Sequence, residues 1–151
     1  MKRLIIAAVL AAAPLAAHAE DFTFATYFKT IPAIALPPAS AGARREGHQR
    51  FAAATMMTFA DGRQQTTHAI CSSRVAPLGS PFGTSGVCAY TDAGALLYTM
   101  TFFCEKPGQG GAGVNCRAEL AGEGGSWAGR TGVIGFANEP DGSSHGAGRW
   151  N

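Results

Sequence analysis

Hydrophobic and polar positions alternate in short runs along this 151-residue chain and do not recur at helical spacing. The runs are rich in Phe, Tyr, Thr, Val and Ile, and Asp-Gly and Gly-Gly pairs separate them. Such alternation is typical of antiparallel strands, because successive side chains of a strand point to opposite faces. The pattern predicts seven or eight strands, with candidates at residues 22–28, 51–60, 64–71, 87–91, 95–104, 114–120, 132–137 and 146–151.

The turns between these runs favour consecutive hairpins. Asp61-Gly62 is a two-residue hairpin signal, and Asp92-Ala93-Gly94 fits a three-residue turn if Gly94 has a positive φ. Two proline-containing segments, residues 31–47 and 74–86, are expected to be irregular. Many short strands in one domain indicate a small closed barrel or a sandwich, and closure removes exposed strand edges. We therefore predict an all-β fold, a small antiparallel barrel of about eight strands.

The cysteines predict two disulfides. Cys71, Cys88, Cys104 and Cys116 are even in number and contain no C-x-x-C pair, which favours disulfides over zinc ligation. A hairpin centred at residue 110 places Cys104 opposite Cys116, both facing inward. By elimination, Cys71 pairs with Cys88.

The expected strand registers place Cys88 on the inner face, as the Cys71–Cys88 disulfide requires, but place Cys71 on the outer face. A turn at residues 92–94 pairs Tyr90 with Leu96 and Cys88 with Tyr98, so that Cys88 points inward. On the other hairpin, large apolar residues fall on the face opposite Cys71. They are Phe51, Met57, Phe59 and Ile70. Either a β-bulge changes the faces, or the Cys71–Cys88 pairing is wrong.

Residues 1–19 have the composition of a secretory signal peptide. Lys2 and Arg3 precede an apolar stretch that is shorter than the roughly 20 residues of a spanning helix, and Ala17-His18-Ala19 is a small-x-small cleavage signal. We therefore expect a single mature β-barrel domain at residues 20–151, without integral membrane association. The short signal looks bacterial and of the Sec type, so the expected location is periplasmic or secreted.

Loss of this segment changes the charge balance. The full chain has 12 basic and 10 acidic residues, and two of the basic residues leave with the signal, so the mature domain has no formal net charge. A nucleic-acid-binding domain normally has a basic excess or a basic stripe. We therefore expect no nucleic-acid partner.

The stretch GGSWAGRT, at residues 124–131, differs from a phosphate-binding P-loop only at Arg130, which replaces the lysine. A P-loop also needs a helix after it, because phosphate binds at a helix N-terminus. Residues 132–136 (GVIGF) have strand-like composition instead. We expect a structural role, in which glycines let strands approach closely and Trp127 plugs the barrel.

A longer run, GEGGSWAGRTGVIGF at residues 122–136, resembles the G-x-G-x-[FYW]-x-G-x-x-G run of the allene oxide cyclase-like barrel superfamily. Bacterial secreted members commonly close with an aromatic strand, and residues 146–151 (GAGRWN) look similar, as does the turn at residues 91–94. The resemblance covers about residues 50–151 and implies an eight-stranded barrel with an apolar interior. The plant cyclases bind a fatty-acid epoxide there, but no polar catalytic set of theirs aligns with this chain, so their activity is not carried over.

No set of residues in the sequence predicts a catalytic or metal-binding site. His48, His68 and His145 lack the i, i+4 spacing of a zinc site, and no carboxylate is placed to complete one. Glu139 and Asp141 fall in an expected turn, where Asp-Gly is ordinary turn chemistry. We therefore predict no catalytic residue, no metal and no cofactor.

Two features indicate binding. Arg44, Arg45, His48 and Arg50 form a basic cluster that suits an anionic headgroup, a carboxylate ligand or an acidic partner, or that is simply a solvated loop. The interior of an eight-stranded barrel is either filled or wide enough for one small ligand. The candidate ligand-binding residues are His68, as an interior polar group, and Tyr98, Met100, Phe102 and Trp127.

Three functions follow from these features. The leading hypothesis is a binding module that holds a small apolar or amphipathic ligand, which needs a cavity of about 300 Å³. The second is an inhibitor or interaction module that contacts an envelope or extracellular protein through loops 31–50 and 74–86. The third is an enzyme of the cyclase or isomerase type, with His68 as the first titratable group to inspect.

Overall fold

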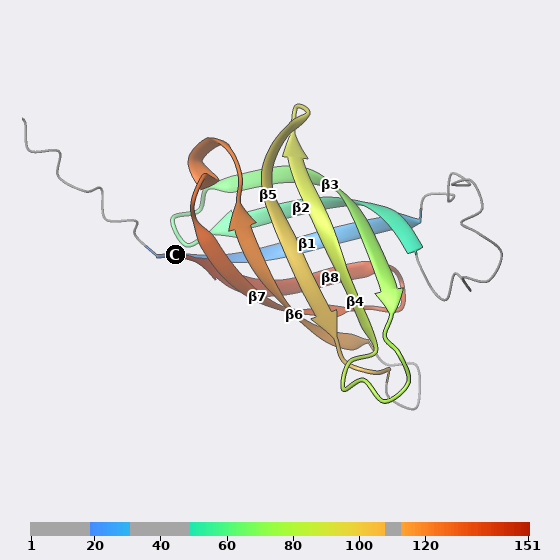
Figure 1. The fold of residues 1–151 in the computed structure, drawn as a ribbon. Helices are drawn as coiled ribbons and strands as arrows, with labels where there is room; N and C mark the ends of the chain where they lie inside the picture. Colours follow the sequence, from blue (N-terminus) through green and yellow to red (C-terminus); the bar gives the residue numbers. More distant parts are fainter. Residues whose placement is uncertain (1–18, 31–48, 108–112) are drawn as a thin grey trace, which may run out of the picture.

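Eight strands follow one another around a closed antiparallel barrel in the computed structural model of the chain, which describes residues 19–30, 49–107 and 113–151 (Figure 1). Each strand pairs with the next, and the last returns to pair with the first. A 3₁₀ turn, η1 (Gly125–Trp127), lies between the sixth and seventh strands. The predicted all-β barrel is confirmed. Its strands are β1 (Glu20–Thr30), β2 (Gln49–Phe59), β3 (Gln64–Val75), β4 (Thr84–Asp92), β5 (Ala95–Cys104), β6 (Val114–Gly122), β7 (Thr131–Asn138) and β8 (Ser143–Trp150).

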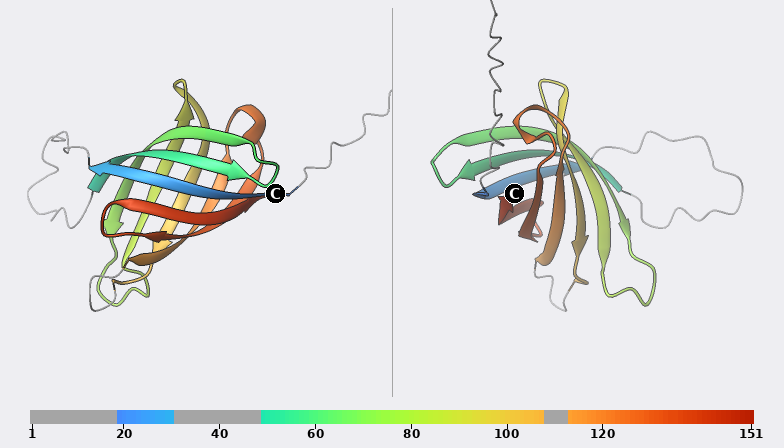
Figure 2. Two further views of the ribbon diagram at one scale, coloured as in Figure 1. Left: turned by 180° about the vertical axis from the view of Figure 1, so that it is seen from behind. Right: turned by 60° about the vertical axis from the view of Figure 1, so that its left-hand side comes forward.

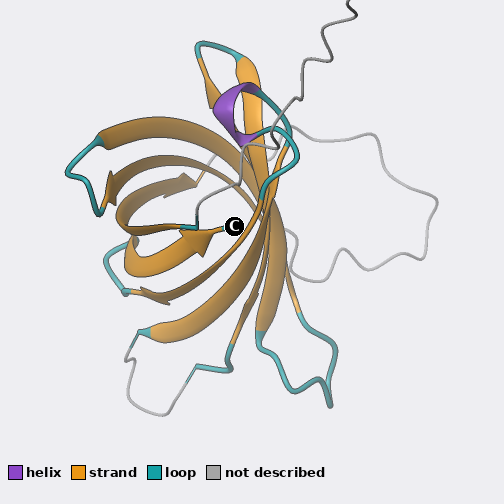
Figure 3. Ribbon diagram, turned by 90° about the vertical axis from the view of Figure 1, so that its left-hand side faces the viewer, coloured by secondary structure: helices purple, strands orange, loops and turns teal. Residues whose placement is uncertain are grey.

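Side chains alternate between the interior and the outer surface along the strands. In β6, Cys116, Ala118 and Leu120 are buried, and the odd-numbered residues between them are exposed. The strands curve around a common interior (Figure 3), and most of the side chains buried in it are apolar or aromatic. Closure also pairs the backbone groups that an edge strand would leave open to another chain.

Both predicted disulfides are present. Cys104 faces Cys116 across β5 and β6, and Cys71 faces Cys88 across β3 and β4. All four residues are buried, and the Cα–Cα distance is 4.0 Å in each bridge. Each disulfide therefore joins two neighbouring strands at directly paired positions.

The turn between β2 and β3 is one residue longer than the predicted two-residue hairpin. The Phe59 N–H donates to the Arg63 carbonyl, and the N–H of Gly62, at φ +84°, donates to the Phe59 carbonyl. A turn that ends in a glycine with positive φ forms a G1 bulge. The extra residue moves the register by one position, so that Phe51 pairs with Cys71.

This bulge resolves the conflict that the sequence raised about Cys71. Phe51, Met57 and Phe59 now share the interior side with Cys71, whereas Ile70 is exposed on the outer surface. The Cys71–Cys88 pairing is therefore compatible with an apolar interior.

The pairing of β4 with β5 corrects a second predicted register. The sequence places Tyr90 opposite Leu96 and Cys88 opposite Tyr98. Each residue instead pairs two positions further along β5, so that Tyr90 faces Tyr98. The turn has two residues rather than three, and Leu97 is an additional residue that forms a bulge in β5. A shift of two residues preserves the face, which is why Cys88 still points inward.

The back of the barrel consists of β8, β1 and β2, side by side (Figure 2). The predicted signal peptide, apart from Ala19, and the whole of the first proline-containing segment, residues 31–47, lie outside the described residues. Within the parts of the chain that the structure describes, no helix has the length and apolar character needed to cross a membrane.

Candidate functional site

The two ends of the barrel are built differently. η1 folds over the end where the chain enters β1 and leaves β8 (Figure 3). At the opposite end β1 finishes and β2 begins, and the interior there contains a cavity of about 280 Å³. We call these the plugged end and the mouth.

Trp127 fills the plugged end. It is 1% exposed, its ring stacks on Phe59 at a centroid distance of 5.8 Å, and it lies 4.6 Å from the Trp150 ring. A Cβ atom on Gly122 would lie 1.7 Å from the Trp127 carbonyl oxygen, so this close approach requires glycine. The glycine-rich stretch therefore serves to fold the chain around a buried indole.

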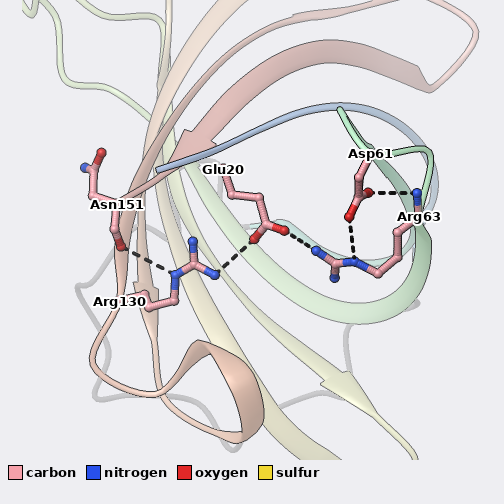
Figure 4. Close-up of polar contacts among 5 residues, drawn as sticks. All are labelled: Glu20, Asp61, Arg63, Arg130 and Asn151. Carbon is pink, nitrogen blue, oxygen red and sulfur yellow. Dashed lines mark hydrogen bonds and ion pairs between the residues drawn. The ribbon is translucent and has the colours of Figure 1, made fainter. Parts of the chain in front are cut away.

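Arg130 stabilises the plugged end through hydrogen bonds and a contact with an aromatic ring (Figure 4). Its Nη1 donates to a Glu20 carboxylate oxygen at 3.0 Å, and its Nε donates to the Asn151 carbonyl at 3.4 Å. The guanidinium lies 5.2 Å from the Trp127 ring centroid. The other Glu20 oxygen accepts a hydrogen bond from Arg63. Arg130 thus connects the first and last strands through charge and aromatic contacts.

The chain after Arg130 continues into β7, which begins at Thr131. A strand at this point supplies no helix N-terminus for phosphate, so the resemblance of GGSWAGRT to a P-loop has a structural cause.

Two stacked tyrosines fill the middle of the barrel. The rings of Tyr90 and Tyr98 lie 4.5 Å apart, and the Tyr98 hydroxyl is 3.1 Å from the Thr67 hydroxyl. Burial raises the pKa of Tyr90 to about 12 and raises the pKa of Tyr98 well above its ordinary value. Both phenols therefore stay neutral at physiological pH. Buried, hydrogen-bonded threonines lie beside them, so aromatic and small polar side chains together fill the middle of the barrel.

Phenyl rings form much of the mouth cavity. Phe28 and Phe51 meet edge to face at 5.1 Å between centroids, and Phe102 meets Phe136 in the same way at 6.5 Å. All eight strands contribute lining residues, so the cavity is the unfilled continuation of the barrel interior. The lining comprises Phe28, Gln49, Phe51, Ser73, Thr84, Cys88, Met100, Phe102, Cys104, Val114, Phe136, Asn138, Glu139 and Ser143.

Asn138 and Glu139 add hydrogen-bond acceptors to this lining. The Asn138 Nδ2 lies 3.4 Å from the Cys116 sulfur, and its Oδ1 is buried without a hydrogen-bond partner among the described residues. Glu139 follows at the start of the β7–β8 turn, and one of its carboxylate oxygens is 3.9 Å from the exposed His145 Nδ1. Glu139 is the one charged residue among the described lining residues.

A more open hollow, of about 720 Å³, lies on the outer wall over β5 to β8. Its lining includes Phe103, Val133 and Arg149, whose side chains are exposed. We take the mouth as the candidate site because all eight strands surround it and its aromatic lining continues the core.

The predicted ligand-binding residues separate into three groups. Met100 and Phe102 line the mouth cavity. Tyr98 and Trp127 belong to the filled part of the interior. His68 is exposed on the outer surface, so its expected interior position is wrong. The reason is the alternation of β3, in which its neighbours Thr67 and Ala69 point inward.

Sequence reasoning missed most of the mouth. Glu139 and Asp141, near the β7–β8 turn, show why: from the sequence, both are predicted to be turn residues without a binding role. Asp141 does have that role: it accepts hydrogen bonds from the Ser143 N–H and hydroxyl, which lower the pKa of its carboxyl group. Glu139 lines the cavity instead. The inward parity of residues at strand ends is the signal that would have found Phe28, Phe51 and Phe136.

Arg44, Arg45 and His48 of the predicted basic cluster lie outside the described residues, and Arg50 is exposed at the start of β2. Among the described residues, no group of three His, Cys, Asp or Glu side chains is placed to hold a metal ion.

Fold and site together define a small disulfide-bonded β-barrel with one plugged end and one hollow, aromatic mouth. No protein-family model matches the sequence, and comparison with curated proteins and with solved structures gives no match.

Proposed function

We propose that the protein is a binding module that holds a small apolar or amphipathic molecule in its mouth cavity. The observation that carries this proposal is the aromatic cavity of about 280 Å³. Small-molecule pockets start at about 300 Å³ and combine apolar walls with a few polar groups. The apolar part of a ligand would contact the phenyl rings, and its polar part would stay at the rim beside Asn138 and Glu139.

Two serines on β3 provide a matched test of this proposal. Ser73 is buried and lines the cavity, whereas its neighbour Ser72 is exposed on the outer surface. Ser73→Leu should fill part of the cavity and weaken binding of the neutral fluorescent probe N-phenyl-1-naphthylamine by about tenfold or more, and Ser72→Leu should leave binding unchanged. Equal probe affinities for the two variants would contradict the cavity proposal.

The natural ligand class can be sought directly. The oxidised protein, starting at residue 20, would be analysed by native mass spectrometry before and after organic extraction. A retained mass that extraction removes is the expected result, and its identity gives the ligand class. If both spectra show only the mass of the polypeptide without a ligand, a role in protein interaction would be favoured.

We also propose that the protein is exported through its N-terminal leader and acts in the periplasm or outside the cell. Two buried disulfides support this proposal, because disulfides persist in oxidising compartments. Expression of the full chain in a bacterial host should give a periplasmic product whose N-terminus is Glu20. A cytoplasmic product that retains residues 1–19 would contradict it.

We further propose membership of the allene oxide cyclase-like barrel superfamily. The eight-stranded closed barrel agrees with the fold that this resemblance implies, and residues 122–136 run from the end of β6 through η1 into β7. A solved relative with the same closure and the same buried tryptophan would support the assignment.

A second candidate function is protein interaction through the loop between β3 and β4. Leu78 is fully exposed there, and Val75 and Phe82 are also exposed apolar residues. Such an apolar tip suits insertion into a partner's cleft. If this function holds, Leu78→Ser should abolish capture of the same envelope protein that the unmodified barrel retains in a pull-down.

A further inference from the structure

The rim of the mouth cavity indicates the chemistry of the ligand's polar end. Resting on the binding function proposed above, we infer that the ligand is a small amphipathic amine, with an apolar body inside the cavity and a protonated nitrogen at the rim. The plant cyclases of the superfamily that the sequence resembles bind a fatty-acid epoxide, whose carboxylate has the opposite charge; the resemblance implies the fold and an apolar interior for this chain, and not that ligand.

The acceptors at the rim are the first observation. Glu139 brings a carboxylate to the cavity wall, and Asn138 brings a carbonyl oxygen that is buried and lacks a hydrogen-bond partner within the described ranges. The amide nitrogen of Asn138 lies 3.4 Å from the Cys116 sulfur. The positive charge of a ligand would pair with the Glu139 carboxylate, which is the charged group of the described lining.

The aromatic lining is the second, independent observation. Phe28 and Phe51 come from β1 and β2, and Phe102 and Phe136 come from β5 and β7, so phenyl rings approach the cavity from different sides. These rings provide the apolar surface that contacts the body of the ligand. Aromatic rings attract cations and not anions, so rings near a rim carboxylate favour an ammonium group over a carboxylate as the polar end of the ligand.

Glu139 lines the cavity, whereas two other carboxylates at this end of the barrel, Asp141 and Glu105, do not. Asp141, two residues later, accepts two hydrogen bonds from Ser143 and does not line the cavity. Glu105 lies at the same end of the barrel, is exposed, and accepts a hydrogen bond from Asn115 at 3.5 Å. Glu105→Gln therefore provides a control with the same change in charge as Glu139→Gln.

Three probes with the same eight-carbon tail separate the ligand classes: octylamine, 1-octanol and octanoate. Binding to the oxidised protein would be measured by NMR titration, with the shifts of cavity residues as the readout. Octylamine should bind about five- to tenfold more tightly than octanol, and octanoate should bind most weakly. Glu139→Gln should reduce octylamine affinity to about that of octanol and leave octanol affinity unchanged. Glu105→Gln should change neither.

Each other outcome has a definite meaning. If octanoate binds as tightly as octylamine, or if Glu139→Gln leaves the order unchanged in a variant with native chemical-shift dispersion, the inference about the amine is wrong and the cavity proposal stands. If none of the three probes binds, the cavity proposal itself is wrong, and the inference fails with it.

Discussion

Trp127 shows how much of the barrel depends on one side chain. It is 1% exposed, lies between Phe59 and Trp150, and fills the plugged end. Trp127→Ala should lower the free energy of unfolding by about 3–5 kcal/mol, because the surroundings cannot close over the space that the indole leaves. Urea denaturation followed by far-ultraviolet circular dichroism measures the change. Ser126→Ala, at the exposed neighbouring position, should change stability by less than about 0.5 kcal/mol.

Arg130 permits a test of the P-loop resemblance. Arg130→Lys completes the G-x-x-x-x-G-K-[ST] pattern but cannot reproduce the planar contacts with Glu20, Asn151 and Trp127. The variant should lose about 1–2 kcal/mol of stability and should gain no affinity for ATP. Isothermal titration with ATP and urea denaturation give the two readouts. Measurable ATP binding by the variant would show that the structural account of this stretch is wrong.

The buried tyrosines predict a loss of stability at high pH. Tyr90 has a pKa of about 12 in the folded barrel, and the pKa of Tyr98 is also raised, whereas an unfolded tyrosine ionises near pH 10. Below about pH 10 both states are protonated, so the tyrosines do not affect stability. Between about pH 10 and 12 the unfolded chain holds fewer protons than the folded one. The free energy of unfolding should therefore fall with rising pH, by about 1.4 kcal/mol per pH unit for each tyrosine.

Urea denaturation at closely spaced pH values from 8 to 12 measures this slope. Tyr98→Phe should make it about half as steep, and Tyr27→Phe, which changes an exposed residue, should leave it unaltered. An unfolding free energy that stays constant above pH 10 would contradict the burial of the two phenols.

At the scale of elements, the disulfides join strands that are already paired. The Cys104–Cys116 bridge spans 12 positions, and the Cys71–Cys88 bridge spans 17. Replacement of either pair by alanines should lower the free energy of unfolding by about 3 kcal/mol, because an open loop has more freedom in the unfolded chain. Urea denaturation of each double variant tests this. A loss below about 1 kcal/mol for both would show that strand pairing alone restrains these loops.

The strands and the cysteine pairing could be predicted from sequence because alternation and turn residues are local signals. The register of β5 with β6 was also predicted correctly, but those of β2 with β3 and of β4 with β5 were not. The same Asp-Gly pair serves a two-residue turn and a three-residue turn with a bulge at Gly62. An error of one residue reversed the expected face of Phe51, whereas the error of two residues beside Tyr90 changed the partner and preserved the face. Turn geometry therefore decided which predictions failed.

The candidate site was predicted only in part, for a reason of the same kind. Met100 and Phe102 were expected to line the interior and do, but the sequence does not say at which depth a barrel is filled. Tyr98 and Trp127 are large enough to close the middle and one end, and that leaves the hollow at the other end. Glu139 lines the cavity because the β7–β8 turn lies at the rim of the mouth. This position depends on how all eight strands close into the barrel, and local sequence patterns do not determine it.

For the whole molecule, closure depends on the pairing of β1 with β8. Glu20 pairs with Trp150 across this seam, so the two ends of the barrel chain are neighbours. A chain that lacks residues 143–151 should fail to fold, because it loses Trp150 and exposes the edges of β1 and β7. Size-exclusion chromatography and NMR dispersion test this expectation.

A circular permutant is the matched control. It joins residue 151 to residue 20 through a short Gly-Ser linker and opens the chain between β5 and β6, so that all eight strands and the seam are kept. The permutant should fold to the same barrel. A folded truncated chain would show that the seam is not required.

The pairing of β1 with β8 also determines when the barrel can close during synthesis. Asp21 in β1 forms an ion pair with Arg149 in β8, 128 positions later. The first strand can therefore pair with β8 only after the last strand has been synthesised. Contacts between such distant residues form slowly, because a long loop must close before they form. During translation the barrel therefore remains an open, incomplete sheet. This delay suits the export proposed above, because a chain that has not yet folded can pass through a narrow channel. The pairing of β1 with β8 that closes the barrel therefore also postpones its folding.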